Sequence, residues 1–298
     1  MTIISEQRKD DKPLELENRK VAERNDLISS VAKMDKTPLK IFEMAVSCID
    51  ALNPPKDNKV FLSKTELYHL LKVSDSNKHT RFKEAIVTLH KQAVFEIREM
   101  NDKKGKFEYR VISPIEETAW NDYSDTIHIT FTNSIMPFLI DLGTKYTQYA
   151  ITDIMELNSK YSIILYKWLS MHYNQFVYYS KKGERRKEQL EEYKNPTLKI
   201  SDLRTMTDTI DEYSRFQSLE TWIVKKPLEE ISKHTQFNVT YEKLKEGRTI
   251  DGIQFHISKK EQPQELNGEY KEREQDPAYL KEKENRENKQ KILFAEAM

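Results

Sequence analysis

Hydrophobic residues in the first half of the chain change from helical spacing to alternation near residue 95. Three segments between residues 37 and 89 carry apolar side chains at the intervals of three and four typical of an amphipathic helix. Thr37-Pro38 opens the first, a Ser63–Glu66 capping box opens the second, and a polar turn at 74–77 precedes the third. Residues 95–97 and 107–111 then alternate around a turn that contains Gly105. Helices followed by a hairpin predict a winged helix-turn-helix domain.

The second half repeats this order of elements. A helix is predicted over 161–172, a basic turn over 181–187, and further helical segments near 201–206, 216–223 and from Pro227 onward. Residues 237–239 and 253–257 alternate on either side of a polar turn. Between the halves, residues 127–131 alternate as a strand, and 137–142 form a short apolar segment.

Short matches support a duplication. Residues 95–97 (Phe-Glu-Ile) match 237–239 (Phe-Asn-Val) at an offset of 142, and Gly105 matches Gly247 at the same offset. The predicted fold class is therefore α+β, mainly helical, with two tandem winged helix-turn-helix domains that have β-hairpin wings. The predicted boundaries are a flexible arm at 1–26, an N-terminal winged helix at 27–150, a C-terminal one at 151–260 and a charged tail at 261–298.

Composition fits two domains inside a reducing compartment. The chain has 298 residues, of which 37% are hydrophobic and 33% charged, and a single cysteine, Cys48. One cysteine excludes an internal disulfide and a cysteine-based zinc site. No apolar run approaches the roughly 18–20 residues of a membrane span, and the N-terminus lacks the apolar centre of a signal peptide. We therefore expect a cytoplasmic protein with no membrane partner.

Charge is distributed unevenly although its sum is zero. Residues 77–110 have 9 basic and 5 acidic side chains, and residues 177–260 have 17 and 14, which gives net charges of +4 and +3. Residues 261–298 have 10 acidic and 7 basic side chains, a net charge of −3. The two positive segments coincide with the two predicted winged helices, as expected of DNA-binding surfaces, although a solvated surface produces the same imbalance.

The N-terminal turns of the predicted second helix of each helix-turn-helix carry side chains that can contact bases or phosphates in a major groove. In the first copy these candidates are Asn77, Lys78, His79, Thr80, Arg81 and Lys83. In the second they are Ser214, Arg215, Gln217, Ser218, Thr221 and Lys225. An exposed polar helix face is the alternative interpretation of both sets.

Cations at the predicted hairpin tips favour the DNA-binding interpretation, because a basic wing beside a polar recognition helix occurs twice. The tip residues are Lys103, Lys104 and Lys106 in the first copy, and Lys243, Lys245 and Arg248 in the second. We expect them to neutralise phosphates that flank the contacted bases.

Catalytic patterns are missing from the sequence. It has no phosphate-binding loop, no nucleophile elbow and no paired histidines at metal-ligand spacing. We therefore predict a protein that is not an enzyme and that needs no metal or cofactor. Trp168, Phe216 and Trp222 lie at helical spacing and are predicted to belong to the core.

Several short segments, in order, resemble one protein family. They are residues 25–28 (Asn-Asp-Leu-Ile), 62–67 (Leu-Ser-Lys-Thr-Glu-Leu), 160–166 (Lys-Tyr-Ser-Ile-Ile-Leu-Tyr), 203–204 (Leu-Arg), 213–216 (Tyr-Ser-Arg-Phe), 227–231 (Pro-Leu-Glu-Glu-Ile) and 239–241 (Val-Thr-Tyr). The chain from about Asn25 to Lys260 thereby resembles the iteron-binding plasmid replication initiators of the two-winged-helix type, known from theta-replicating plasmids of low-GC Gram-positive bacteria.

This resemblance implies a function. Such initiators bind double-stranded origin repeats as monomers, help to open the duplex, recruit host replication proteins and, as homodimers, repress their own promoter. It also implies that the C-terminal winged helix reads bases and that the N-terminal one contacts DNA and forms the dimer interface. Two alternatives stay open at this point: a transcriptional repressor with two DNA-binding domains, and a winged-helix adaptor that binds proteins.

Overall fold

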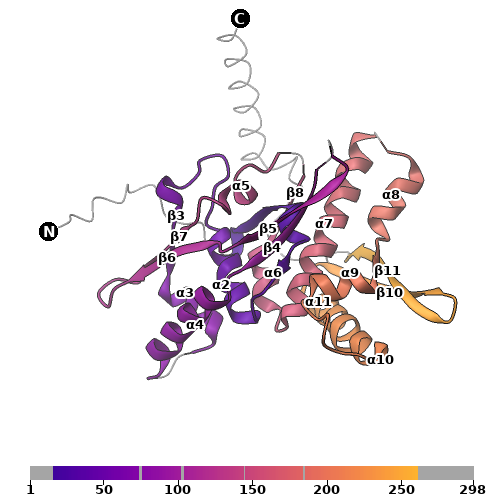
Figure 1. The fold of residues 1–298 in the computed structure, drawn as a ribbon. Coiled ribbons are helices and arrows are strands. Elements are labelled where there is room, and N and C mark those ends of the chain that lie inside the picture. The colour runs from indigo at the N-terminus through magenta and orange to yellow at the C-terminus, as the bar shows by residue number, and fades with distance from the viewer. Residues whose placement is uncertain (1–15, 74–75, 102–103, 144, 184, 261–298) are drawn as a thin grey trace, which may run out of the picture. The chain divides into compact units, whose positions relative to one another are not determined.

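The first predicted winged helix is present in the computed structural model, which describes residues 16–73, 76–101, 104–143, 145–183 and 185–260 (Figure 1). Its helices are α2 (Lys36–Val46), α3 (Lys64–Leu71) and α4 (Lys78–Gln92). The Ser63 hydroxyl caps α3 by accepting a hydrogen bond from the backbone N–H of Glu66, as the sequence predicts. The hairpin of β4 (Phe95–Asn101) and β5 (Lys106–Ile112) follows.

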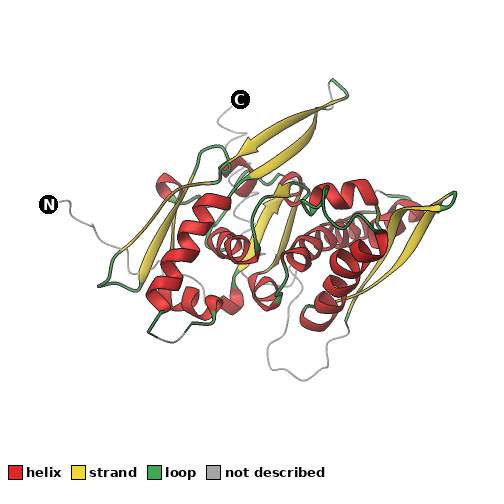
Figure 2. Ribbon diagram, turned by 60° about the horizontal axis from the view of Figure 1, so that its bottom comes forward, coloured by secondary structure: helices red, strands yellow, loops and turns green. Residues whose placement is uncertain are grey.

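The second winged helix has the predicted order as well. Its helices are α9 (Ile200–Met206), α10 (Phe216–Leu219), the π-helical η3 (Glu220–Lys225) and α11 (Lys226–His234). The hairpin of β10 (Phe237–Glu246) and β11 (Thr249–Lys259) joins β9 (Thr197–Lys199) in a sheet of order β10-β11-β9. Figure 2 shows both hairpins as two-stranded ribbons that extend beyond their helices. The predicted fold class is confirmed.

The two glycines that suggested a duplication occupy equivalent places. Gly105 and Gly247 both lie at a hairpin tip with φ of +61°, a conformation that a residue without Cβ adopts at no steric cost. The phenylalanines that begin the two hairpins, Phe95 and Phe237, are both buried.

Most of the remaining elements enlarge the N-terminal module. Besides the winged-helix sheet β2-β4-β5, it contains a sheet of order β3-β7-β6 and the pair β1-β8. The bounds not yet given are η1 (Leu16–Asn18), β1 (Lys20–Arg24), α1 (Asn25–Ile28), β2 (Val31–Ala32), η2 (Lys56–Asn58), β3 (Lys59–Ser63), β6 (Ile115–Trp120), β7 (Thr126–Phe131), α5 (Met136–Leu139), β8 (Tyr146–Ala150), α6 (Ile151–Glu156), α7 (Lys160–Lys182) and α8 (Lys187–Lys194).

The prediction of a flexible arm at residues 1–26 is wrong for residues 16–26, which form η1, strand β1 and the start of α1. Val21 and Glu23 of this strand are fully buried, and β1 pairs with β8, more than a hundred residues later in the chain. Because the pairing partner is so distant, the residues near β1 contain no pattern that predicts the pairing. The buried glutamate also has the polarity of a surface residue. The rest of the expected arm, residues 1–15, and the expected tail, residues 261–298, lie outside the described residues.

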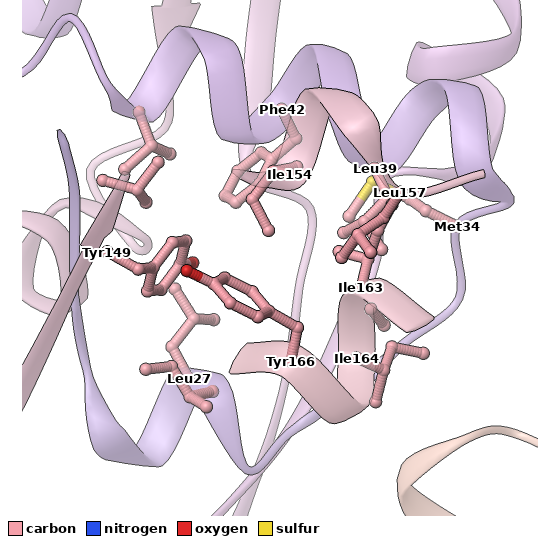
Figure 3. Packing of buried hydrophobic residues seen from close by; sticks show 14 of the residues in the cluster. Leu27, Met34, Leu39, Phe42, Tyr149, Ile154, Leu157, Ile163, Ile164 and Tyr166 are labelled. Carbon is pink, nitrogen blue, oxygen red and sulfur yellow. The ribbon is translucent and has the colours of Figure 1, made fainter. Parts of the chain in front are cut away.

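Helix α7 packs into the core with residues of both modules. It contacts α1, α2 and β8, and the Tyr166 hydroxyl donates to Asp153 of α6 at 2.5 Å. Figure 3 shows Tyr166 turned toward Tyr149 of β8. The two rings meet edge to face, with centroids 5.8 Å apart. Two residues later, Trp168 packs against Phe255 of β11, with ring centroids 5.5 Å apart.

A buried charge cluster connects α7 to the N-terminal module. The Lys167 Nζ lies 2.8 Å from Glu23 Oε2 and 2.5 Å from Glu43 Oε1, and all three side chains are almost inaccessible. The Tyr149 hydroxyl donates to Glu43 Oε2 at 2.8 Å. Burial alone lowers the pKa of Lys167, but the adjacent carboxylates outweigh it and raise that pKa. Burial and the neighbouring Glu23 raise the pKa of Glu43 to about 7, against the opposing effect of Lys167.

We expect the Glu43→Gln variant to gain stability relative to the wild type as pH rises from about 4.5 to about 7. In this window the folded protein holds a proton on Glu43 that the unfolded chain has released, so the wild type loses stability with rising pH. Urea unfolding of both proteins across the window measures the difference. A difference that does not change with pH would contradict the raised pKa of Glu43.

Candidate nucleic-acid interface

The turn of the second helix-turn-helix is held by one arginine. The guanidinium of Arg204, on α9, donates to the carbonyl oxygens of Thr209, Glu212 and Tyr213 at 3.0, 2.5 and 2.7 Å. The turn contains two non-glycine residues with positive φ, Asp208 at 53° and Tyr213 at 49°, a conformation that persists only when its surroundings fix it. Arg204 therefore fixes the direction in which the chain enters the next helix.

In the sequence, Arg204 belongs to the Leu203-Arg204 pair of the family resemblance, and it is not among the predicted site residues. An arginine near the end of a short helix is common, and its carbonyl partners become neighbours only when the turn has formed. Arg204 is therefore a positioning residue that local pattern alone does not reveal.

We expect Arg204→Ala to weaken binding to the specific DNA site about tenfold or more, because three carbonyl oxygens of a strained turn lose a charged donor. Arg204→Lys retains the positive charge but lacks the planar guanidinium group that reaches several carbonyl oxygens at once. It should therefore recover only part of the lost affinity. Fluorescence anisotropy with labelled duplex measures both, and circular dichroism checks that the fold is retained. Wild-type affinity in the alanine variant would show that the turn needs no such support.

The predicted reading face is exposed on the helix that follows and on the two residues before it. The side chains of Ser214, Arg215, Gln217, Ser218 and Lys225 are all exposed. Leu219, Ile223 and Val224 of the same helical stretch are buried and hold it against the core. Thr221 is half-buried, and its hydroxyl donates to the Gln217 carbonyl at 2.8 Å, so this hydroxyl proton is already engaged. The polar candidates thus lie on the side of the helix away from the core.

The prediction that Trp222 belongs to the core is wrong, since this side chain is 50% exposed. Its three-residue spacing from Leu219 suits an α-helix, but η3 has the wider π-helical hydrogen-bond pattern, which moves position 222 off the buried stripe. The Lys226 ammonium lies over the indole ring, 3.4 Å from its centroid. Of the other predicted core aromatics, Trp168 is buried and Phe216 is half-buried.

The second wing is connected to the reading helix through Glu220. The Glu220 carboxylate accepts from the Tyr241 hydroxyl at 2.9 Å and lies 3.0 Å from Lys243 Nζ. Partial burial raises the pKa of Glu220, but the hydrogen bonds from Lys243 and Tyr241 outweigh it and lower that pKa. Lys243 therefore links wing and helix, whereas Lys245 and Arg248 are exposed near the tip.

The first module presents its candidates differently. Asn77, Thr80, Arg81 and Lys83 are exposed at the start of α4. The other two candidates pack on Tyr68 of α3, which is not among the predicted site residues. The Lys78 ammonium lies 5.4 Å from the Tyr68 ring centroid, and His79 Nδ1 lies 3.2 Å from its hydroxyl.

The first wing also carries exposed cations. Lys104 and Lys106 are exposed at its tip, and Lys104 Nζ lies 3.6 Å from the Glu108 carboxylate. The third cation expected there, Lys103, lies outside the described residues.

Within the part of the chain that the structure describes, no helix is both long and apolar enough to cross a membrane. Among the same residues, no three His, Cys, Asp or Glu side chains come together in a group that could hold a metal ion.

Two family models match the chain, in the order of its two modules. Residues 20–170 match the model described as initiator replication protein, WH1, and residues 199–257 match initiator Rep protein, WH2. The chain belongs to the initiator replication protein family. The first match begins at β1, the strand that the sequence pattern missed, and it ends inside α7.

Relatives of this initiator support the same assignment. The PI protein of Escherichia coli is 25% identical over 261 residues, which cover 80% of this chain and 82% of the relative. A replication initiation protein of Escherichia coli is 19% identical over 225 residues, covering 72% of this chain and 63% of that protein. The solved structure of a Pi initiator protein in complex with iteron DNA has a TM-score of 0.63 at 22% identity and covers 83% of this chain and 99% of that one. At this identity, the structural likeness shows a shared fold.

Proposed function

We propose that the initiator binds repeated sites, or iterons, at a plasmid origin of replication and promotes opening of the duplex there. The exposed polar face of the Arg204-supported helix is the observation that carries this proposal. A Pi initiator protein of the same fold has been solved in complex with iteron DNA, which supports the choice of ligand. The exposed side chains match the groups that read base edges in a major groove.

The proposal assigns different tasks to the two modules. The C-terminal winged helix, within residues 151–260, reads bases through Ser214, Arg215, Gln217, Ser218 and Thr221, with Lys225, Lys245 and Arg248 near phosphates. The N-terminal winged helix, within residues 27–150, contacts the DNA backbone through the exposed start of α4 and its wing. Lys243 supports the wing through Glu220.

A mobility-shift titration of the DNA that flanks the gene tests the choice of ligand. Iteron binding should produce a ladder of complexes, one step for each repeat, that resists competition by random duplex. A single shifted species, or complexes that random duplex removes equally well, would argue against iterons.

We further propose that the initiator forms a homodimer through strand β5 and represses its own promoter in that form. Strand β5 is one of the two edge strands of the sheet β2-β4-β5. Three of its apolar side chains, Phe107, Tyr109 and Val111, are 38%, 74% and 73% exposed. Exposed edge strands pair readily with another strand.

The sequence of β5 is complementary to itself in the antiparallel direction. With Tyr109 at the symmetry axis, Glu108 faces Arg110 of a second copy, and Phe107 faces its Val111. Within one chain, Arg110 lies 3.3 Å from Glu99, and Glu108 lies 3.6 Å from Lys104. At least one partner of each pair is exposed, and such pairs stabilise a fold little, so their exchange for intermolecular pairs costs little free energy.

We expect Tyr109→Lys to raise the dimer dissociation constant by an order of magnitude or more, since two like charges would meet at the axis. Sedimentation equilibrium measures this constant. Tyr123→Lys, at a tyrosine that is 83% exposed outside this sheet, is the matched control. An unchanged constant for Tyr109→Lys, or an equal rise for both variants, would place the interface elsewhere.

Recruitment of host replication proteins belongs to the same proposal, and its support is family membership. The proposal places the initiator in the cytoplasm with the plasmid DNA, and it assigns no catalytic reaction to the chain.

A further inference from the structure

Tyrosines and cations cluster between the last turns of α7 and the neighbouring helix α8. The residues are Tyr178, Tyr179, Lys182, Arg185 and Tyr193, and we call them the α7–α8 patch. The patch lies between the two family matches, which end at residue 170 and resume at residue 199. None of the roles proposed above uses it.

The aromatic part of the patch is built by both helices. The rings of Tyr179, on α7, and Tyr193, on α8, stack with centroids 5.5 Å apart and an interplanar angle of 17°. Tyr178 meets Tyr179 edge to face at 5.1 Å and 78°. Tyr193 thus supports Tyr179 from one helix to the next, whereas the neighbouring Tyr178 is 47% exposed.

Cations surround these rings. The Arg185 guanidinium lies 4.7 Å from the Tyr179 centroid, and the Lys182 ammonium lies 5.7 Å from that of Tyr178. The sequence from 178 to 187 contains five basic residues and one acidic residue, a net charge of +4 in ten residues. The patch therefore combines an exposed aromatic ring with a concentrated positive charge.

We propose that the α7–α8 patch binds a single strand of DNA, with one unstacked base against Tyr178 and the adjoining phosphates near Lys182 and Arg185. Stacking on aromatic side chains beside cations is how proteins bind single strands without reading their sequence. A duplex offers only base edges and phosphates, because its base faces are covered by neighbouring bases. An acidic peptide would use the cations but has no need of an exposed ring.

Anisotropy with a labelled oligothymidylate of about 20 nucleotides and the full chain tests this proposal. The wild type should bind the oligonucleotide, and Tyr178→Ala should weaken that binding about tenfold. Tyr178→Phe, which keeps the ring, should bind as the wild type does. Tyr123→Ala, at a tyrosine exposed elsewhere, should change nothing. Binding of Tyr178→Ala to random duplex should equal that of the wild type.

Three results would each overturn the proposal. The wild type could fail to bind oligothymidylate, or Tyr178→Ala could lose affinity equally for duplex and single strand. Arg185→Glu could weaken oligothymidylate binding while Tyr178→Ala leaves it unchanged, which would indicate a purely electrostatic surface suited to phosphates or an acidic peptide. Iteron binding is measured on duplex DNA, so failure of that proposal is recognised separately.

Discussion

Replacing Lys167 by methionine is expected to lower the free energy of unfolding by about 3–5 kcal/mol. The ammonium group lies within 2.8 Å of Glu23 and Glu43, and neither carboxylate has access to water. Methionine fills a similar volume, so the loss comes mainly from two buried acids without their cation. Urea unfolding at pH 7 measures it.

Two further variants separate this charge effect from a packing defect. Lys33→Met removes an exposed ammonium that lies 2.6 Å from Asp208, and should cost less than about 1 kcal/mol. Adding Glu23→Gln and Glu43→Gln to Lys167→Met should restore much of the lost stability, because neutral amides need no buried cation. A loss for Lys167→Met below about 1 kcal/mol, or no recovery in the triple variant, would contradict the account of this cluster.

Replacing Arg215 by alanine is expected to weaken binding to the specific site by about 1–3 kcal/mol, or roughly 5- to 150-fold, with a much smaller loss on random duplex. Arg215 is exposed directly after the Arg204-supported turn, at the start of the reading helix. A guanidinium there can bind a guanine edge through two hydrogen bonds, which random sequence offers only by chance. Fluorescence anisotropy with the specific duplex and with random duplex measures the loss of affinity for each.

Lys245→Ala is the matched control for Arg215→Ala. Lys245 is exposed on the second wing. Its removal should therefore weaken binding to the specific and the random duplex by a similar factor and make binding less dependent on salt. If Arg215→Ala behaved as Lys245→Ala does, Arg215 would be a phosphate contact, and the base-reading role would belong to other residues.

The helices and wings could be predicted from sequence because their signals are local. The capping serine at Ser63, the apolar stripe of α4 and the tip glycines all act within a few residues of their positions. Strand β1 could not be predicted, since its partner β8 is far away in sequence and its buried Glu23 is polar. The same holds for Lys167, whose partners come from two other elements.

The candidate site was predictable in part. In the sequence, polar residues interspersed with apolar residues at helical spacing locate the reading face at residues 214–225. Most of these polar side chains are exposed in the structure. The pairing of Lys243 with Glu220 could not be inferred, because it depends on how the wing folds back toward the helix. Arg204 was missed for a related reason, since its partners are carbonyl oxygens that every residue possesses.

Footprinting of the DNA that flanks the gene tests the central claim most directly. Our account predicts protection of several evenly spaced direct repeats by the wild type, and loss of that protection in Arg215→Ala at the same protein concentration. Protection of one palindrome alone would contradict iteron binding and favour a repressor. If the Arg215→Ala variant still protected the repeats at that concentration, the assignment of base reading to this helix would be contradicted.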